Sequence, residues 1–213
     1  MPCRPEHVEV PAPHPTADPD GARRMRDLLA TRRSIRHFSS EPVDEQIIND
    51  AIAAANSAPS GANRQPWRFV VVADPQRKAE IRHGAENEER AFYSTRASEE
   101  WLEALAPLGT DWRKPHLTDA PLLIVVFEVH RPKPYYAKES VGIAVGFLLA
   151  ALHAAGLATL THTPSPMKFL NGILDRPGHE RPHLLIPTGR AAPDAMVPDI
   201  AKMAAEDVTV WLR

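Results

Sequence analysis

Cysteine is almost absent from this sequence, since Cys3 is the only one among 213 residues. A single thiol cannot form a disulfide within the chain, and no Cys-x-x-Cys pair is present to hold zinc or an iron–sulfur cluster. The sequence therefore predicts neither a disulfide framework nor a cysteine-based metal centre, and it fits a reducing cytoplasm.

Clustered positive charge and long apolar runs are also missing. The formal net charge is -2 at pH 7 and the basic residues are dispersed, whereas a nucleic-acid-binding protein needs clustered cations to displace counterions. The most hydrophobic stretch, Val141 to Ala155, is shorter than the roughly 20 apolar residues of a membrane span, and His153 interrupts its end. We therefore expect no nucleic-acid partner, no membrane insertion and a buried helix at this stretch.

Three common enzyme signatures do not occur either. The chain lacks Gly-x-Gly-x-x-Gly, Gly-x-x-x-x-Gly-Lys-[Ser/Thr] and Gly-x-Ser-x-Gly, the motifs of a Rossmann site, a P-loop and an α/β-hydrolase elbow. His179-Glu180-Arg181-Pro182-His183 matches the zinc motif His-Glu-x-x-His literally. Pro182 breaks the helix that would place both imidazoles on one face, so we expect no metal site.

What is present is a pattern of strands separated by helices within one domain. Continuous apolar runs predict strands at Phe69–Val72, Leu122–Val129, Leu157–Thr161 and Leu184–Ile186. Helical spacing predicts helices around Met25–Leu29, over Ile47–Ala55 and from about Ser140 to Ala155, the last closed by Gly156. Small residues along the last helix favour close packing against another helix, including one of a second subunit.

The two ends and one long polar stretch stand apart from this pattern. Residues 1–20 contain six prolines and predict an extended arm before a single domain over 21–213. The polar stretch Asp74–Ala120 predicts a lid over a site, at about 84–116. Val208–Leu212 alternates like a strand, and such a strand needs a sheet edge, which a second copy would offer.

A basic segment and a glycine-bearing loop carry the strongest functional signal. The segment is Arg32-Arg33-Ser34-Ile35-Arg36, and the loop is Pro59-Ser60-Gly61-Ala62 with Pro66-Trp67 after it. Each alone has an ordinary interpretation, because arginines favour helix C-termini and Pro, Ser and Gly are common in turns. Together they supply fixed cations and backbone amides for a phosphorylated cofactor. We interpret them as a flavin site.

Glu89, Tyr93 and Lys114 lie within the predicted lid. A spacing of four places Glu89 and Tyr93 on one helix face, where a solvated surface is the simplest interpretation. A carboxylate, a phenol and an ammonium on one segment would also suit a zwitterionic amino acid. Glu89 would then pair with its ammonium group, and Lys114 and Tyr93 with its carboxylate.

These residues resemble the nitroreductase superfamily of FMN-dependent homodimers, over about residues 32–198. The lid triad resembles the iodotyrosine deiodinase branch, and Thr161-His162-Thr163-Pro164 resembles the Thr-Thr-Thr-Pro run of the family. The resemblance implies an α+β fold with a mixed central sheet flanked by helices. It also implies a homodimer with an exchanged C-terminal strand.

The resemblance gives each matching residue an expected role. The residues expected to bind FMN are Arg32, Arg33, Ser34, Arg36, Ser60, Thr161, His162, Thr163 and Lys202. Thr163 is the expected catalytic residue, because its counterpart hydrogen-bonds the reactive flavin nitrogen. The residues expected to bind substrate are Ala62, through its backbone amide, and Glu89, Tyr93 and Lys114. Two positions depart from the family: His162 replaces a threonine, and Lys202 replaces an arginine that would give a bidentate contact.

The expected function is FMN-dependent reductive dehalogenation of halogenated tyrosine, which releases halide and tyrosine. NAD(P)H or a reductase would supply the electrons, and the enzyme would be cytoplasmic. Two alternatives stay open. One is a general NAD(P)H-dependent nitroreductase or quinone reductase whose lid residues only coat a pocket. The other is a non-catalytic module that binds flavin or tyrosine.

Overall fold

The computed structural model describes residues 18–213, so most of the predicted arm over 1–20 lies outside the described residues. The chain divides into two compact units between Arg32 and Arg33. In the first unit, α1 (Pro19–Ala30) begins after Asp18, whose side chain accepts a hydrogen bond from the N–H of Asp20. Pro19 is the first residue of this helix, whereas the sequence predicted it to be part of the arm over 1–20. The fixed φ of proline suits the first helical position.

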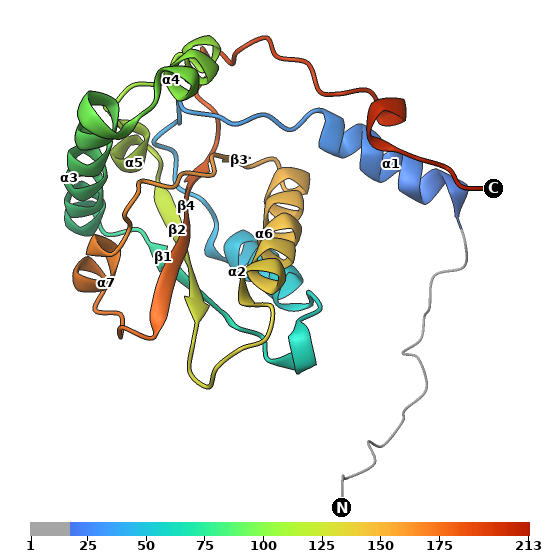
Figure 1. Cartoon of the computed structure of the whole chain (residues 1–213), viewed down its shortest axis with the longest axis horizontal. Coiled ribbons are helices and arrows are strands. Elements are labelled where there is room, and N and C mark those ends of the chain that lie inside the picture. The colour runs from blue at the N-terminus through green and yellow to red at the C-terminus, as the bar shows by residue number, and fades with distance from the viewer. Residues whose placement is uncertain (1–17) are drawn as a thin grey trace, which may run out of the picture. The chain divides into compact units, whose positions relative to one another are not determined.

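In the second unit, four strands form one sheet in the order β1-β2-β4-β3 (Figure 1). The strands are β1 (Trp67–Val72), β2 (Leu122–Val129), β3 (Ala158–Thr159) and β4 (Glu180–Gly189). All their pairings are antiparallel. Among the described residues, parallel pairing is limited to the isolated bridge between Ser34 and Thr159. The α+β class is confirmed, and the sheet is less mixed than expected.

The four strands predicted within the sheet are present, but three have different ends, and β1 begins at Trp67 rather than Phe69. β4 extends well beyond Leu184–Ile186, because Pro182 is accommodated at a register shift where it lies opposite Phe127. A proline has no N–H to donate, so it is tolerated where the ladder is already irregular. β3 is shorter than predicted, and His162 then forms an isolated bridge with Leu185.

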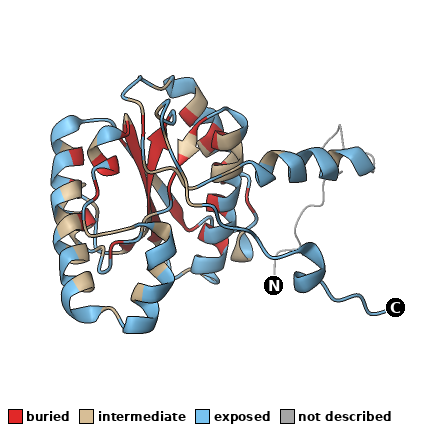
Figure 2. Cartoon of the chain, turned by 90° about the horizontal axis from the view of Figure 1, so that it is seen from above, coloured by how far each residue is buried: buried red, intermediate tan, exposed pale blue. Residues whose placement is uncertain are grey.

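Helices cover both faces of the sheet. α2 (Glu45–Asn56) and α6 (Ala137–Ala154) pack on one face, and α3 (Pro75–Ala91), α5 (His116–Asp119) and α7 (Phe169–Ile173) on the other. Alternate residues of β2 join the two cores, Leu122, Ile124 and Val126 on the first side and Leu123, Val125 and Phe127 on the second. Figure 2 shows the resulting buried layer between the helices. The continuous apolar run of β2 is explained by burial on both sides.

The predicted helices at Ile47–Ala55 and Ser140–Ala155 correspond to α2 and α6. Asp44 caps α2 by accepting a hydrogen bond from the N–H of Gln46, and Gly156 follows α6 with φ +78°. By length and composition, α6 is the one described helix that is long and apolar enough to cross a membrane. Its buried residues, Ser140, Val141, Ala144, Val145, Leu148 and Leu152, lie in the core of this fold.

Between β1 and β2 the chain is mostly helical. After α3 come the π-helical turn η2 (Phe92–Arg96), α4 (Glu99–Leu105), the 3-10 turn η3 (Ala106–Leu108) and α5. Ile81 and Ala85 of α3 are fully buried, so the first part of the polar stretch Asp74–Ala120 is a core helix. The predicted lid, about 84–116, therefore begins within this core helix.

Two short 3-10 turns complete the described chain, η1 (Gly61–Asn63) before β1 and η4 (Ala205–Val208) near the C-terminus. The predicted strand Val208–Leu212 has no strand partner among residues 18–213. Val210 and Leu212 are 86% and 94% exposed. Unpaired backbone groups of such a segment need another chain or water, so strand exchange stays a prediction.

Candidate active site

A cavity of about 390 Å³ lies among α3, η2, the loop before α5 and the segment after β3. Seven residues predicted as site residues line it: Arg36, Glu89, Tyr93, Lys114, Thr161, His162 and Thr163. Sequence reasoning missed several other lining residues, among them Trp101, Leu105, Thr110 and His116. The structure thus brings together three regions that are far apart in the sequence: Arg36, the predicted lid from Glu89 to His116, and Leu160–Ser165.

Lys114 and Glu89 form a shielded ion pair in this cavity. Their side chains are 7% and 14% exposed, and Lys114 Nζ lies 3.0 Å from Glu89 Oε2. Lys114 Nζ also donates a hydrogen bond to the backbone oxygen of Asp111. A charge in such surroundings is costly unless it is paired, and here the two opposite charges compensate each other.

Tyr93 lies beside this pair. It belongs to the π-helical turn η2, a form that is rare and frequent at functional sites. Its hydroxyl lies 3.0 Å from Thr110 Oγ1, and Lys114 Nζ lies 5.6 Å from its ring centroid. A carboxylate, an ammonium and a phenol therefore share one wall of the cavity.

The segment Thr161–Thr163 also lines the cavity. His162 exchanges two backbone hydrogen bonds of 2.9 Å with Leu185 of β4, which fixes the segment to the sheet. Thr161, His162 and Thr163 all contribute to the lining of the cavity.

His162 meets His116, with ring centroids 5.6 Å apart and planes at 87°. Nε2 of both rings is shielded from solvent and has no hydrogen-bond partner among the described residues. Burial, with Lys114 and Arg36 nearby, lowers the pKa of His116 to about 3. Burial, with His116 and Lys114 next, also lowers the pKa of His162 well below its ordinary value. Both rings are therefore neutral and offer unused nitrogen atoms to a ligand.

Arg36 lines the same cavity and is half-buried. Burial lowers the pKa of its guanidinium, partly offset by Tyr93. Within residues 18–213 no carboxylate lies within ion-pair distance of Arg36. A half-buried guanidinium without an acceptor is suited to bind an anionic or carbonyl-rich ligand.

The predicted loop residues Ser60 and Ala62 lie outside this cavity in the single chain. Ser60 Oγ accepts a hydrogen bond of 2.9 Å from the N–H of Gln65, and Ala62 has a left-handed φ of 51°. A Cβ on Gly61 would lie 2.7 Å from the backbone oxygen of Tyr135. Glycine is therefore required where this loop meets the start of α6.

The remaining predicted site residues do not line the cavity either. Arg32 ends the unit that contains α1, Arg33 is exposed, and Ser34 is bridged to Thr159. Lys202 is exposed in the C-terminal segment. Their predicted contacts with a flavin stay predictions.

The stretch His179–His183, which matches the zinc motif, lies on β4 and the residue before it, not on a helix. Arg176 forms two hydrogen bonds, of 2.7 and 2.9 Å, with the Glu180 carboxylate. His183 Nδ1 lies 2.9 Å from Glu128 Oε1, and His130 Nε2 lies 2.9 Å from Glu128 Oε2. The motif residues thus belong to separate carboxylate contacts.

Comparison with known proteins gives consistent matches. The Nitroreductase family matches residues 29–190. An iodotyrosine deiodinase of Haliscomenobacter hydrossis is 55% identical over 179 residues, which cover 80% of this chain and 81% of that protein. Iodotyrosine deiodinase 1 of Mus musculus is 43% identical over 222 residues, covering 96% and 77%.

Solved structures agree with these sequence matches. A crystal structure of oxidised iodotyrosine deiodinase bound to FMN and 3-iodo-L-tyrosine has a TM-score of 0.76 and 32% identity, and covers 89% of this chain and 97% of that one. A nitroreductase with bound FMN from Bacteroides fragilis has a TM-score of 0.66 and 19% identity, covering 88% and 98%. The second match concerns the fold alone.

Proposed function

This chain belongs to the nitroreductase family, and on that premise we propose that it is an FMN-dependent reductive dehalogenase of halogenated tyrosine. The products are halide and tyrosine. The similarity to iodotyrosine deiodinases over most of both chains supports this function. The arrangement of charges in the cavity supports it independently.

The shielded Glu89–Lys114 pair is the observation that carries the proposal. An amino acid brings one ammonium and one carboxylate, which match this pair in sign and number. Insertion of the ligand exchanges one ion pair for two and leaves the net charge of the cavity unchanged. Glu89 receives the ammonium, and Lys114 and Tyr93 receive the carboxylate.

The cavity residues also fit FMN. Arg36 offers a guanidinium without an acceptor, and His116 and His162 offer nitrogen atoms without partners among the described residues. We assign Arg36, Thr161, His162 and Thr163 to the ring system, with Thr163 as the catalytic residue, and Arg33, Ser34 and Lys202 to the phosphate end. FMN supplies the electrons that, with a proton, replace the carbon–halogen bond by carbon–hydrogen.

A second copy of the chain would complete the site, because the loop with Ser60 and Ala62 does not reach the cavity of its own chain. α6 offers a surface for such a partner. Ile143 and Phe147 are each 42% exposed, and next to them a Cβ on Gly142 or Gly146 would meet nothing within 4 Å. Exposed apolar side chains beside small residues suit close packing of helices.

The exchanged C-terminal strand is part of this proposed dimer. Its residues Val208–Leu212 would pair with a sheet edge of the partner, and β1 is an edge strand of the sheet. A cavity of about 640 Å³ next to Val71 of β1 offers room for its side chains. We propose NAD(P)H or a separate reductase as the electron source, and the cytoplasm as the location.

The direct test is anaerobic reduction of the purified, FMN-loaded protein with 3-iodotyrosine present. We expect stoichiometric release of iodide and tyrosine, and quenching of flavin fluorescence when the oxidised protein is titrated with the same ligand. A protein that does not retain FMN, or that releases no iodide, would contradict the proposal.

A further inference from the structure

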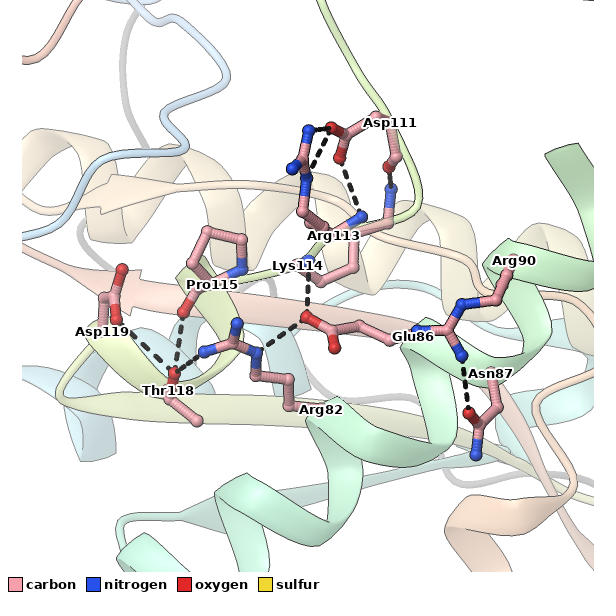
Figure 3. A network of polar contacts seen from close by, with 10 residues as sticks. All are labelled: Arg82, Glu86, Asn87, Arg90, Asp111, Arg113, Lys114, Pro115, Thr118 and Asp119. Carbon is pink, nitrogen blue, oxygen red and sulfur yellow. Dashed lines mark hydrogen bonds and ion pairs between the residues drawn. The ribbon is translucent and has the colours of Figure 1, made fainter.

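Glu86 of α3 contacts the segment Asp111–Thr118, which runs into α5 (Figure 3). Glu86 lies about one helical turn before Glu89. Glu86 Oε1 accepts a hydrogen bond of 2.9 Å from the backbone N–H of Lys114. The same oxygen accepts one of 2.7 Å from Arg82 Nε. The Glu86 side chain is 17% exposed, so water competes little for these bonds.

Two carboxylates of α3 therefore hold one lysine. Glu86 contacts its backbone and Glu89 its ammonium. Residues three apart on a helix are neighbours on its surface, which is why both carboxylates reach the same loop. Lys114 is thus held at its backbone and at its ammonium group. When the carboxylate of a ligand binds the Lys114 ammonium, only the contact with Glu89 is released, and the contact with Glu86 stays.

Arg82 connects Glu86 to α5 (Figure 3). Arg82 Nη1 donates a hydrogen bond of 2.9 Å to Thr118 Oγ1, and Thr118 Oγ1 donates one of 3.0 Å to the backbone oxygen of Pro115. Burial raises the pKa of Glu86, but the Lys114 N–H and Arg82 outweigh it, so the pKa lies below its ordinary value. Glu86 is a carboxylate at neutral pH and accepts charge-assisted hydrogen bonds.

We propose that Glu86 is a positioning residue, which fixes the backbone of Lys114 and thereby makes the site select the carboxylate of an amino acid substrate over a halophenol without one. This inference rests on the proposed function. Attraction and hydrogen bonding between ammonium and carboxylate depend steeply on distance and direction. A loop held in place before binding also loses less freedom when the ligand arrives.

The test compares two ligands on the FMN-loaded protein, 3-iodotyrosine and 2-iodophenol, by quenching of flavin fluorescence. We expect E86A to weaken binding of 3-iodotyrosine about tenfold, as for loss of one charge-assisted hydrogen bond. Binding of 2-iodophenol should stay within about twofold, because that ligand has no group for Lys114. E86Q keeps an acceptor oxygen for the Lys114 N–H and should recover most of the lost affinity.

E88A is the matched control, because Glu88 is also on α3 and pairs with Arg96 at 3.1 Å without contacting Lys114. It should leave both affinities within about twofold. In a K114Q background, E86A should have no further effect on 3-iodotyrosine, since the group that Glu86 positions is gone. If E86A does not fold, E86D supports the same comparison, because it keeps the charge but withdraws the carboxylate by one methylene.

The outcomes separate this inference from the proposed function. A wild-type protein that does not bind 3-iodotyrosine overturns both. If the wild type binds it and E86A weakens both ligands equally, Glu86 only supports the fold and the inference is wrong. An undiminished effect of E86A in the K114Q background overturns it too.

Discussion

Strand β2 and the segment predicted as a lid, about 84–116, are held in place by different forces. All side chains of β2 from Leu122 to Phe127 are buried between two apolar clusters. In the lid, Lys114 pairs with Glu89, and Arg90 stacks on Trp112 with Cζ 4.1 Å from the ring. Apolar burial has no substitute in water, whereas a polar contact can be exchanged for a ligand or for water at a small difference in free energy. If the segment is a lid as predicted, this difference would let it respond to a ligand while the sheet stays unchanged.

The largest effect on stability is expected from a substitution in the buried part of β2. Phe127 is fully buried, and F127A should lower the free energy of unfolding by about 3–5 kcal/mol through lost burial and a residual cavity. Urea unfolding followed by circular dichroism measures this. V71A is the control, because Val71 on the neighbouring strand is 43% exposed, and it should cost less than about 1 kcal/mol. Equal losses in both variants would refute the two-sided burial of β2.

The next effect concerns binding rather than folding. K114Q leaves Glu89 charged and unpaired, so it should weaken 3-iodotyrosine binding by about 2–3 kcal/mol, roughly a hundredfold, and should also reduce stability. In the double variant E89Q/K114Q both charges are removed, and we expect stability to recover while affinity does not. Fluorescence titration and thermal unfolding, run on the same samples, distinguish the two quantities. Recovery of affinity in the double variant would contradict the zwitterion exchange.

A smaller effect is expected at His116, where the lid region carries an unsatisfied nitrogen. H116F removes that nitrogen and should stabilise the ligand-free protein by about 1 kcal/mol at pH 7.5, while FMN binds more weakly. The pKa of His116 is lowered to about 3 in the fold, so below the ordinary value near 6.5 the unfolded chain binds the proton and the folded chain does not. The stability of the wild type should therefore fall as pH decreases from about 6.5, by at most roughly 1.4 kcal/mol per pH unit from this group.

The stability difference between H116F and wild type should accordingly widen between pH 6.5 and pH 5. Urea unfolding at several pH values on the apoprotein measures it, and FMN affinity is obtained separately by titration. A constant difference across this range would show that His116 does not titrate between the folded and unfolded states as its lowered pKa implies.

The contrast between apolar burial and polar contacts also explains which parts of the structure could be predicted from the sequence. α2 and α6 were predictable because burial of one face imposes a helical period on apolar residues, and β2 because burial of both faces makes its apolar run continuous. Glu89 and Tyr93 could be placed on one face because four residues make about one helical turn. Helix α1 was not predicted to start at Pro19, since a proline-rich segment has the composition of an arm and proline at a first helical position leaves no periodic signal.

The polar contacts of the site could not be predicted from local patterns, and the resemblance pointed only to Glu89, Tyr93 and Lys114 among the lid residues. His116 faces His162 and Glu86 faces the backbone of Lys114 across long sequence separations, and such pairs impose no period on the residues between them. The exchanged strand at Val208–Leu212 has its proposed partner in another chain, so neither the sequence pattern nor the single chain places it. Local sequence patterns indicate which residues are buried, whereas the polar contacts of the site join segments that are distant in the sequence.

The smallest effect is expected where a lid contact is exposed and no ligand replaces it. The Glu88 and Arg96 side chains are 31% and 38% exposed, and a pair in that setting contributes about 0.5 kcal/mol or less because water and salt compete for both charges. E88A should therefore lower the midpoint of thermal unfolding by no more than about 2 °C, and 0.5 M NaCl should abolish the difference. A larger loss, insensitive to salt, would mean that the lid is held by more than exchangeable polar contacts, and the contrast with β2 would no longer hold.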